Sequence, residues 1–441
     1  MWQEVRTGWT DAFTPRATGG WDSYPALSDL MPWVTPGVTG NRAWPYAPST
    51  SILERRWNRL QGEPDEAVRR TLLKETRDRT LEKLPQKVLV DGAPTVALIE
   101  DRSTASLQPV RVGFRSFDRQ WLIPDNRVLD MARPDLWEAR IPGQVFVVEQ
   151  HSEAFAGGPG IVVTALIPDL HHFNNRGGRV LPMLHPDGTG NVPPGLLAAL
   201  SELLGTPVTA QDLLAYTAGV VAHPGYTRTF QDALVTPGVR VPITDSREFF
   251  ERAKALGEEV VWAQTYGEAC SSPARPAGSI RYPQGDPRQP QLATPLVAMP
   301  DDVTYDSGAE TLILGDGRFT GVPPAVREYA VGGRNVIDSW VNYRKAEPGG
   351  KKTSPLDRIH EDTWPTEWSR ELIDLLTVLR RLTDLEPRQN ELLMGILAGH
   401  TLTMDDLAEA GTAWPLTKKH RAVRRSLFNG RDGFGLTDTA D

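Results

Sequence analysis

Alternating apolar and polar residues mark the central part of the chain as strand-forming. The segment VRVGFRSFDRQWLIP, residues 110–124, has the two-residue period of a half-buried β-strand. The β-branched runs QVFVVEQ (144–150) and GIVVTALIP (160–168) predict two further strands, and the glycines between them favour an antiparallel connection. Residues 310–322, ETLILGDGRFTGV, predict a hairpin with Asp316-Gly317 at its turn.

Apolar residues at helical spacing dominate much of the remaining chain. The pattern predicts a helix that begins near Ile52 and continues to about Leu84, with a break and a fresh start at GEPDEA. Residues 364–399 predict two helices broken at Pro387, because proline removes a helical hydrogen bond. Antiparallel strands with flanking helices indicate the α+β fold class. The other predicted helices cover residues 196–205, 210–234, 246–267, 324–331 and 335–345.

The chain divides into three predicted segments. Residues 1–85 form a Trp- and Pro-rich arm followed by a helical linker, and the many aromatic residues of this arm need another domain to pack against. Residues 86–346 form an α+β domain, in which the Pro-rich stretch near 271–300 is expected to be an exposed loop or insertion. Residues 347–441 form a C-terminal helical region.

Composition places the chain among folded, water-soluble proteins. It has 441 residues, of which 24% are charged and 39% hydrophobic. No apolar run is long enough to span a bilayer, and the N-terminus lacks the pattern of a secretion signal, so the expected location is the cytoplasm. Cys270 is the only cysteine, which rules out an internal disulfide and a thiolate metal cluster. The net charge of −8 argues against a protein that coats nucleic acid, although several segments are locally basic.

The segment TALIPDLHHFNNRGGRVLP (164–182) carries the densest group of candidate functional residues. A metal site built from Asp169, His171, His172 and His185 would make the chain a hydrolase, but no metal-ligand motif at the spacing of known sites supports it. The glycines at 315–317 are better explained by the hairpin than by a dinucleotide loop. The chain contains no phosphate-binding loop, no serine-nucleophile motif and no aromatic base-holding loop of an adenine methyltransferase.

Nucleic-acid binding is the other interpretation of this segment. Arginine matches guanine edges, asparagine matches adenine edges, and arginine or lysine holds phosphates. HHFNNRGGR supplies all of these residue types in one loop beside strands, and FRSFDRQW adds Arg115, Asp118 and Arg119. The structural alternative is that Asn174, Asn175 and Gly177 form a turn while Asp118 pairs with an arginine to fix the local fold. Composition alone favours neither.

A series of ordered sequence blocks resembles the C-terminal specificity region of type ISP restriction-modification enzymes, from about Trp21 to Leu385. The blocks are MPWVTPGVTGNRAW, FRSFDRQWLIPDNRVLDMARPDLW, VTALIPDLHHF, LLAYTAGVVAHPGYTRTF, VPITDSREFFERAKALGEEVV, REYAVGGRNVIDSWVNYRK and WPTEWSRELIDLLTVLRRL. In that family, one polypeptide carries a nuclease, a helicase-like motor, an adenine-N6 methyltransferase and then this target-recognition region.

The resemblance implies sequence-specific binding of double-stranded DNA in phage defence, without catalysis by this chain. Either another chain supplies the adenine-N6 methyltransferase with its S-adenosylmethionine, and the helicase and nuclease components, or this chain is the remnant of a split gene. No cofactor is expected here. The Trp-rich arm would pack against the methyltransferase. A docking module that does not touch DNA and an autonomous metal-dependent hydrolase remain the alternatives.

The candidate DNA-binding residues are expected to converge on one cationic groove. The family-like block FRSFDR recurs whatever the target, which favours a role in building the fold or holding phosphate. The candidates are Arg115, Arg119, Arg127, Arg133, Asn174, Asn175, Arg176, Arg179, Arg344, Lys345, Lys351 and Lys352.

Overall fold

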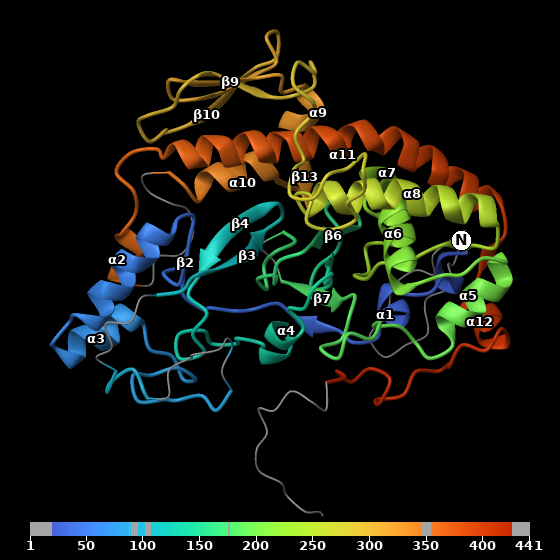
Figure 1. The fold of residues 1–441 in the computed structure, drawn as a ribbon, viewed down its shortest axis with the longest axis horizontal. Helices are drawn as coiled ribbons and strands as arrows, with labels where there is room; N and C mark the ends of the chain where they lie inside the picture. Colours follow the sequence, from blue (N-terminus) through green and yellow to red (C-terminus); the bar gives the residue numbers. More distant parts are fainter. Residues whose placement is uncertain are drawn as a thin grey trace, which may run out of the picture.

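The computed structural model describes residues 20–87, 89, 96–101, 107–174, 177–345 and 354–425 (Figure 1). The helices are η1 (Trp21–Ser23), α1 (Leu27–Leu30), α2 (Thr50–Gln61), α3 (Glu66–Leu73), α4 (Pro134–Glu138), α5 (Leu196–Leu204), α6 (Ala210–Val221), α7 (Pro224–Thr229), α8 (Arg247–Gln264), α9 (Pro324–Arg327), α10 (Val336–Asn342), η2 (Pro355–Arg358), α11 (Thr366–Ala398) and α12 (Met404–Glu409). The strands are β1 (Thr35–Pro36), β2 (Tyr46–Ala47), β3 (Val110–Arg115), β4 (Asp118–Leu122), β5 (Phe146–Gln150), β6 (Ile161–Thr164), β7 (Gly178–Pro182), β8 (Ile243–Thr244), β9 (Gln291–Thr294), β10 (Val303–Asp306), β11 (Thr311–Leu314), β12 (Gly317–Thr320), β13 (Ala330–Val331), β14 (Arg334–Asn335) and β15 (Thr401–Leu402).

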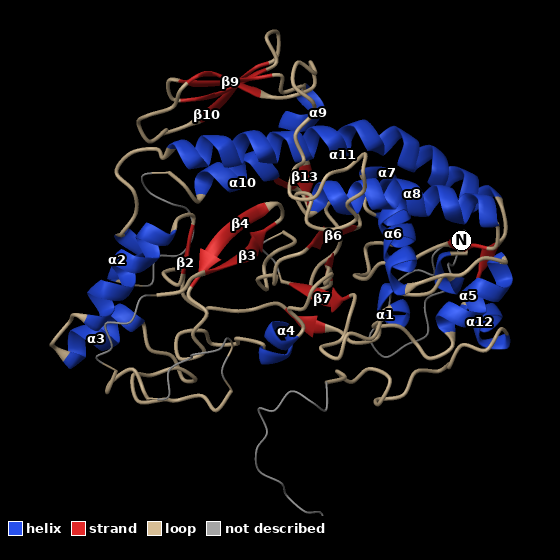
Figure 2. Ribbon diagram, viewed as in Figure 1, coloured by secondary structure: helices blue, strands red, loops and turns tan. Residues whose placement is uncertain are grey.

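Antiparallel sheets form the centre of the molecule, and long helices cover one side of it. One sheet has the order β1-β7-β5-β6 and a second has the order β2-β4-β3. These strands lie beneath α8, α10 and α11 (Figure 2). A third sheet, β10-β11-β12-β9, lies on the opposite side of α11. The arrangement confirms the predicted α+β class and the predicted antiparallel pairing of β5 with β6.

The helix layer depends on a close contact between α6 and α8. Gly219 and Gly257 lie at their crossing, where a Cβ atom on Gly257 would come within 1.7 Å of the carbonyl oxygen of Ala215. The sequence sets the start of α8, because the side chain of Ser246 accepts a hydrogen bond from the backbone N–H of Phe249. The absence of a side chain at both glycines therefore lets the two helix backbones pack together.

The aromatic arm packs within this chain. The Trp21 ring lies 4.8 Å from the Phe230 ring, and the Trp33 ring stacks on His185 at 5.1 Å. The Trp44 indole N–H donates to the carbonyl oxygen of Leu73 at 3.1 Å. These three tryptophans are buried, so the expectation that the arm exposes its aromatic residues for a methyltransferase is wrong for them. Trp2 and Trp9 lie outside the described residues.

The three predicted segments share sheets and one hydrophobic core. From the first segment, β1 pairs with β7 and β2 pairs with β4, so this segment contains more regular structure than its composition predicts. From the third segment, β15 pairs with β8, and α11 packs along α8. The core includes residues from all three. The proposed boundaries at residues 85 and 346 stay a prediction.

One local prediction is wrong because of packing between distant elements. Pro387 lies inside the single 33-residue helix α11 and does not divide it. Buried Leu385 and Leu392 on either side pack against the helix layer, and Gln389 donates to the carbonyl oxygen of Gly219 at 3.2 Å. The stretch 271–300 is mostly exposed, as predicted, although Ile280 is buried and β9 joins the outer sheet.

Smaller differences concern the ends of helices. The helix predicted to reach Leu84 ends at Leu73, where Lys74 adopts a left-handed backbone with φ of 60°. The helix ending predicted at Gly205 is confirmed, with φ of 61°. Within the described part of the chain, no helix has both the length and the apolar character needed to cross a bilayer.

Candidate nucleic-acid interface

The β3–β4 hairpin carries the block FRSFDR at its turn. Phe117 adopts φ of 61°, and its carbonyl oxygen accepts a hydrogen bond from the Tyr266 hydroxyl at 2.7 Å. The Ser116 hydroxyl lies 3.0 Å from the carbonyl oxygen of His172 and 2.6 Å from that of Phe173. These contacts tie the hairpin turn to the end of α8 and to the loop that contains the two adjacent histidines.

Arg115 links the hairpin to the same histidine loop. Its guanidinium donates to the Asp169 carboxylate at 2.7 Å and lies 3.9 Å above the Phe114 ring. Asp169 also accepts a hydrogen bond from the backbone N–H of His171 at 2.9 Å. The Arg115 side chain is 13% exposed, so one part of it reaches the surface of a cavity while its charge is paired inside.

Asp118 links the hairpin to the C-terminal part of the chain. Its carboxylate accepts a hydrogen bond from Arg344 at 2.9 Å, and the two side chains are 1% and 0% exposed. The Arg344 guanidinium also lies 3.6 Å above the Trp340 ring and 3.5 Å from the Glu371 carboxylate. The structural alternative, in which Asp118 pairs with an arginine to fix the fold, is therefore confirmed.

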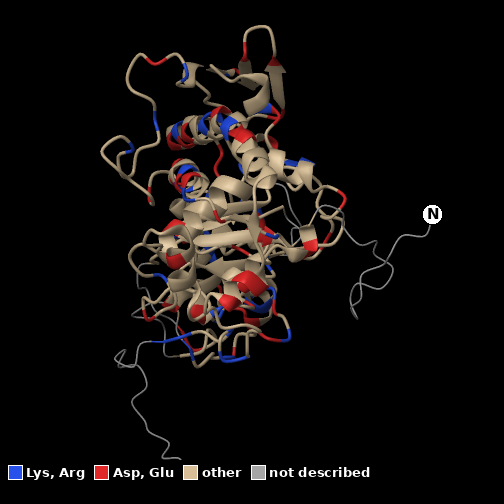
Figure 3. Cartoon of the chain, turned by 90° about the vertical axis from the view of Figure 1, so that its right-hand side faces the viewer, with Lys and Arg blue, Asp and Glu red and all other residues tan. Residues whose placement is uncertain are grey.

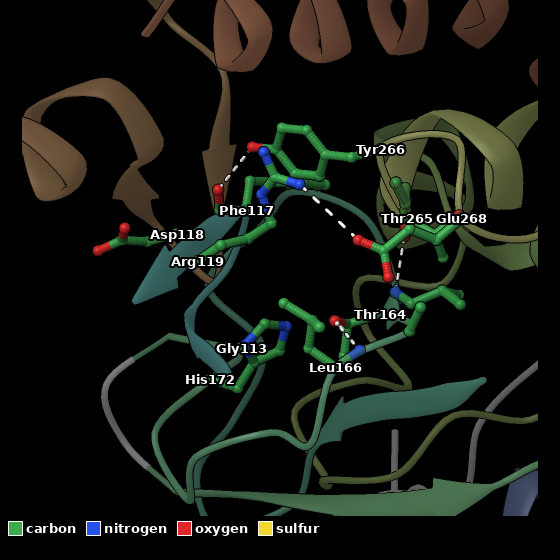
Figure 4. A pocket seen from close by; sticks show the side chains of 13 residues that line it. Gly113, Phe117, Asp118, Arg119, Thr164, Leu166, His172, Thr265, Tyr266 and Glu268 are labelled. Carbon is green, nitrogen blue, oxygen red and sulfur yellow. Dashed lines mark hydrogen bonds and ion pairs between the residues drawn. The ribbon is translucent and has the colours of Figure 1, made fainter. Parts of the chain in front are cut away.

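Arg119 points to the opposite side of the hairpin, into a small pocket with His172 (Figure 4). Its guanidinium stacks on the Tyr266 ring at 3.7 Å and lies 3.8 Å from the Glu268 carboxylate. Neither ring nitrogen of His172 has a hydrogen-bond partner among the described residues. Burial lowers the pKa of His172 to about 4, so this ring is neutral at physiological pH. The free volume of about 10 Å³ is the size of one water molecule.

Other candidate residues serve inside the fold. Arg127 is buried between Asp125, at 2.7 Å, and Asp101, at 2.9 Å. Arg179 pairs with the fully buried Glu149, whose pKa is raised by burial. In such pairs the arginine neutralises an internal carboxylate, so little of its positive charge remains to attract a phosphate group.

The remaining candidates lie apart from one another. Arg133 has φ of 56° and precedes α4, while Asn174 is buried. The Lys345 ammonium donates to the carbonyl oxygen of Asp301 at 2.7 Å. Four candidates fall outside the described residues, namely Asn175, Arg176, Lys351 and Lys352.

A cavity of about 620 Å³ brings together three candidates, Arg115, Arg344 and Lys345. Sequence reasoning missed its other basic residues, Arg42, Arg56 and Lys74. The cavity lies between the segment 39–76, the β3–β4 hairpin and the residues that follow α10. Elsewhere, Lys and Arg are interspersed with Asp and Glu along the same helices (Figure 3). Three of the eight candidates that the structure describes line this cavity, and the convergence of the candidates on one DNA-binding groove stays a prediction.

The histidines do not assemble as metal ligands. His185 stacks on Trp33, and its Nδ1 atom accepts a hydrogen bond from the backbone N–H of Arg424 at 3.1 Å. Over the described ranges, no three His, Cys, Asp or Glu side chains are grouped so that they could hold a metal ion. The alternative of a metal-dependent hydrolase therefore gains no support from Asp169, His171 and His172.

The fold and the ordered sequence blocks define a class of protein, the specificity domains of restriction-modification enzymes. Residues 29–375 match the family described as the Type ISP C-terminal specificity domain, and the chain belongs to this family. No curated protein matches the chain in sequence. The resemblance identified from the sequence is thereby confirmed.

Three solved structures share the fold. The chain is similar to the protein of the DrdV–DNA complex, with a TM-score of 0.58 and 17% identity over 89% of this chain and 40% of that one. It is similar to the ATP-dependent Type ISP restriction-modification enzyme LlaBIII bound to DNA, with a TM-score of 0.58 and 14% identity over 91% of this chain and 26% of that one. For a nuclease-deletion mutant of the Type ISP enzyme LlaGI with a DNA substrate mimic, the TM-score is 0.54 and the identity 15%, over 90% and 30%. The chain spans less than half the length of each.

Proposed function

We propose that this chain recognises a short sequence in double-stranded DNA as the specificity part of a restriction-modification system. The observation that carries the proposal is the match of residues 29–375 to a family of specificity domains. The three similar structures support it, because each of those proteins is bound to DNA or to a DNA mimic. Recognition by this chain would place a target adenine for a methyltransferase, in the cytoplasm and in defence against phage.

The methylation chemistry in this proposal lies outside these 441 residues. S-adenosylmethionine would bind to the adenine-N6 methyltransferase, and helicase and nuclease components would complete the system. This chain would supply the affinity for DNA and the sequence specificity. Basic side chains would contact phosphates, and a small number of loop side chains would contact base edges.

The test is selection from a pool of random duplexes, followed by gel shifts of the full chain at several salt concentrations. We expect one enriched short sequence. We also expect the logarithm of the affinity to fall with the logarithm of the salt concentration, with a slope of about −0.9 for each phosphate contact. Each test is run with and without an adenine-N6 methyltransferase of the same system. If no sequence is enriched and no duplex is shifted in either case, the proposal is refuted.

A docking module that does not contact DNA is the second candidate. It is favoured by the internal pairing of Arg127, Arg179 and Arg344, which removes three basic side chains from the surface. In that case the chain would bind the methyltransferase with an affinity that duplex DNA does not change. A steep salt dependence of duplex binding would refute this second candidate.

A further inference from the structure

The cavity beside the β3–β4 hairpin has the size and lining of a ligand site. Its volume of about 620 Å³ falls in the range of small-molecule pockets and is far larger than a phosphate ion requires. The first wall comes from residues 39–76, the second from the hairpin and the histidine loop, and the third from residues that follow α10. Three parts of the chain that are far apart in the sequence therefore contribute to the cavity.

The charge of the lining favours an anion. Six Lys or Arg residues and three Asp or Glu residues line the cavity. Arg42, Arg115 and Arg344 are paired with carboxylates, so binding of an anion would depend on Arg56, Lys74 and Lys345. Arg56 is buried at the cavity and donates hydrogen bonds to the backbone carbonyl oxygens of Tyr46, at 2.7 Å, and Ile359, at 2.9 Å. The Asp357 carboxylate, which also lines the cavity, offsets part of its charge. Lys74 is exposed, and Lys345 is partly exposed.

Another part of the lining is aromatic. The Phe114 ring lies 4.9 Å from the Tyr343 ring, edge to face, and 5.2 Å from the Tyr46 ring. Tyr343 is half-buried and belongs to the cavity lining, so its ring forms part of the cavity wall. Arg115 lies over Phe114 and joins the aromatic part to the cationic part. A ligand that fits both parts has a flat apolar group attached to an anionic group.

We propose that this cavity binds one nucleotide, with its base against the aromatic wall and its phosphate toward the basic residues. Base stacking on aromatic rings and charge-assisted hydrogen bonds from arginine are the interactions that recognise these two groups. The nucleotide is either free in solution or an unpaired nucleotide of a DNA strand. The inference goes beyond the reading of a duplex, because a free nucleotide needs no duplex to bind.

The experiment is isothermal titration of the full chain with the four 5′-deoxymononucleotides, with deoxyadenosine and with inorganic phosphate. We expect saturable binding at one site by at least one mononucleotide. Deoxyadenosine and phosphate alone should each bind at least fivefold more weakly than that mononucleotide, since each lacks one of the two groups. Inorganic phosphate that binds as tightly as every mononucleotide would overturn the nucleotide assignment.

Two variants test the basic and the aromatic residues of the lining separately. The double variant Lys74→Ala/Lys345→Ala removes exposed charge, and Tyr343→Leu removes one ring from a half-buried position. Each should weaken nucleotide binding at least fivefold, while the exposed Arg247→Ala on α8 should leave it unchanged. Equal unfolding midpoints show that the variants fold. If both variants bind as the parent chain does, the cavity is not the site.

A single-stranded oligonucleotide distinguishes the two sources of the nucleotide. Displacement of the bound mononucleotide by the oligonucleotide assigns the cavity to a nucleotide of a DNA strand, and a lack of displacement assigns it to a free nucleotide. Gel shifts with duplex DNA are measured in parallel. A chain that shifts a duplex but binds no mononucleotide and no single strand would overturn this inference and leave the proposed function standing.

Discussion

Replacing Asp118 by alanine tests whether the buried ion pair with Arg344 holds the hairpin to the C-terminal part of the chain. The variant leaves a buried guanidinium without its shortest carboxylate partner, a loss that costs about 3–5 kcal/mol. Arg344 keeps the Glu371 carboxylate at 3.5 Å and the Trp340 ring at 3.6 Å, which moves the expected value toward the lower end. Gln120 also loses its hydrogen bond to Asp118, of 2.9 Å, which adds about 1 kcal/mol. We expect Asp118→Ala to lower the free energy of unfolding by about 3–4 kcal/mol.

The assay is urea unfolding followed by tryptophan fluorescence, with Arg247→Ala as a control at an exposed position. The control should lie within about 0.5 kcal/mol of the parent chain. The double variant Asp118→Ala/Arg344→Met should lose less stability than the sum of the two single variants, because removing both charges leaves neither one buried alone. A loss below about 1 kcal/mol for Asp118→Ala, or strict additivity in the double variant, would refute the reasoning.

Three further predictions concern the helix contact, the buried histidine and the DNA surface. Gly257→Ala should lower the free energy of unfolding by about 2–3 kcal/mol, because the new methyl group would lie 1.7 Å from the Ala215 carbonyl oxygen, and an unchanged urea midpoint would contradict this close contact. Burial lowers the pKa of His172 to about 4, so between pH 6.5 and 4 the unfolded chain binds a proton that the folded chain does not. Stability should therefore fall as the pH falls through this window, and His172→Gln should make the fall shallower in urea unfolding at each pH, while an identical slope would show that His172 titrates normally. Arg176→Ala should weaken duplex binding about fivefold or more by fluorescence anisotropy, while an affinity equal to that of Arg247→Ala would remove Arg176 from the candidates.

Local pattern was sufficient where an element is defined by its own residues. The helix α8 begins at the Ser246 cap and ends near the predicted position. The predicted hairpin is present, but its turn residues are Gly315 and Asp316, one position before the predicted Asp316-Gly317, because Gly317 pairs with Leu314. The turn between β3 and β4 was not predicted, because Ser116 and Phe117 carry no turn signal and Phe117 adopts a positive φ without being glycine. Contacts with Tyr266 and the histidine loop hold this turn, and they come from residues far away in the sequence.

Elements that depend on distant partners were predicted less well. A proline normally ends a helix, yet α11 continues through Pro387 because buried residues on both sides pack against the same layer of helices. For the aromatic arm, the burial of the tryptophans was predicted but their packing partners were not. Its composition correctly indicated that the tryptophans need to be buried, but the partner of Trp21 is Phe230 in this same chain. Composition predicts that a side chain is buried and does not predict against which surface.

The candidate site shows the same limit for charged residues. An arginine that binds phosphate and an arginine that satisfies an internal carboxylate look alike in a sequence. Asp118 and Arg344 are 226 positions apart, so their pairing could be stated only as an alternative before the fold was known. The cavity residues Arg42 and Arg56 were missed because each lies in a segment assigned to the arm and linker, which the fold brings beside the hairpin.

The basic residues of this chain therefore form two groups. One group is paired inside the fold, and the other is exposed beside the cavity. Arg127, Arg179 and Arg344 are held by carboxylates inside the fold, and changing them should act first on stability. Lys74 and Lys345 are at least partly exposed, and changing them should act on ligand binding with little effect on folding. If the chain recognises one particular DNA sequence, as proposed, its contacting residues could change while the ion pairs that position the hairpin remain. The separation also explains how a chain with a net charge of −8 can present a cationic cavity, since the arrangement of charge and not its total decides what binds.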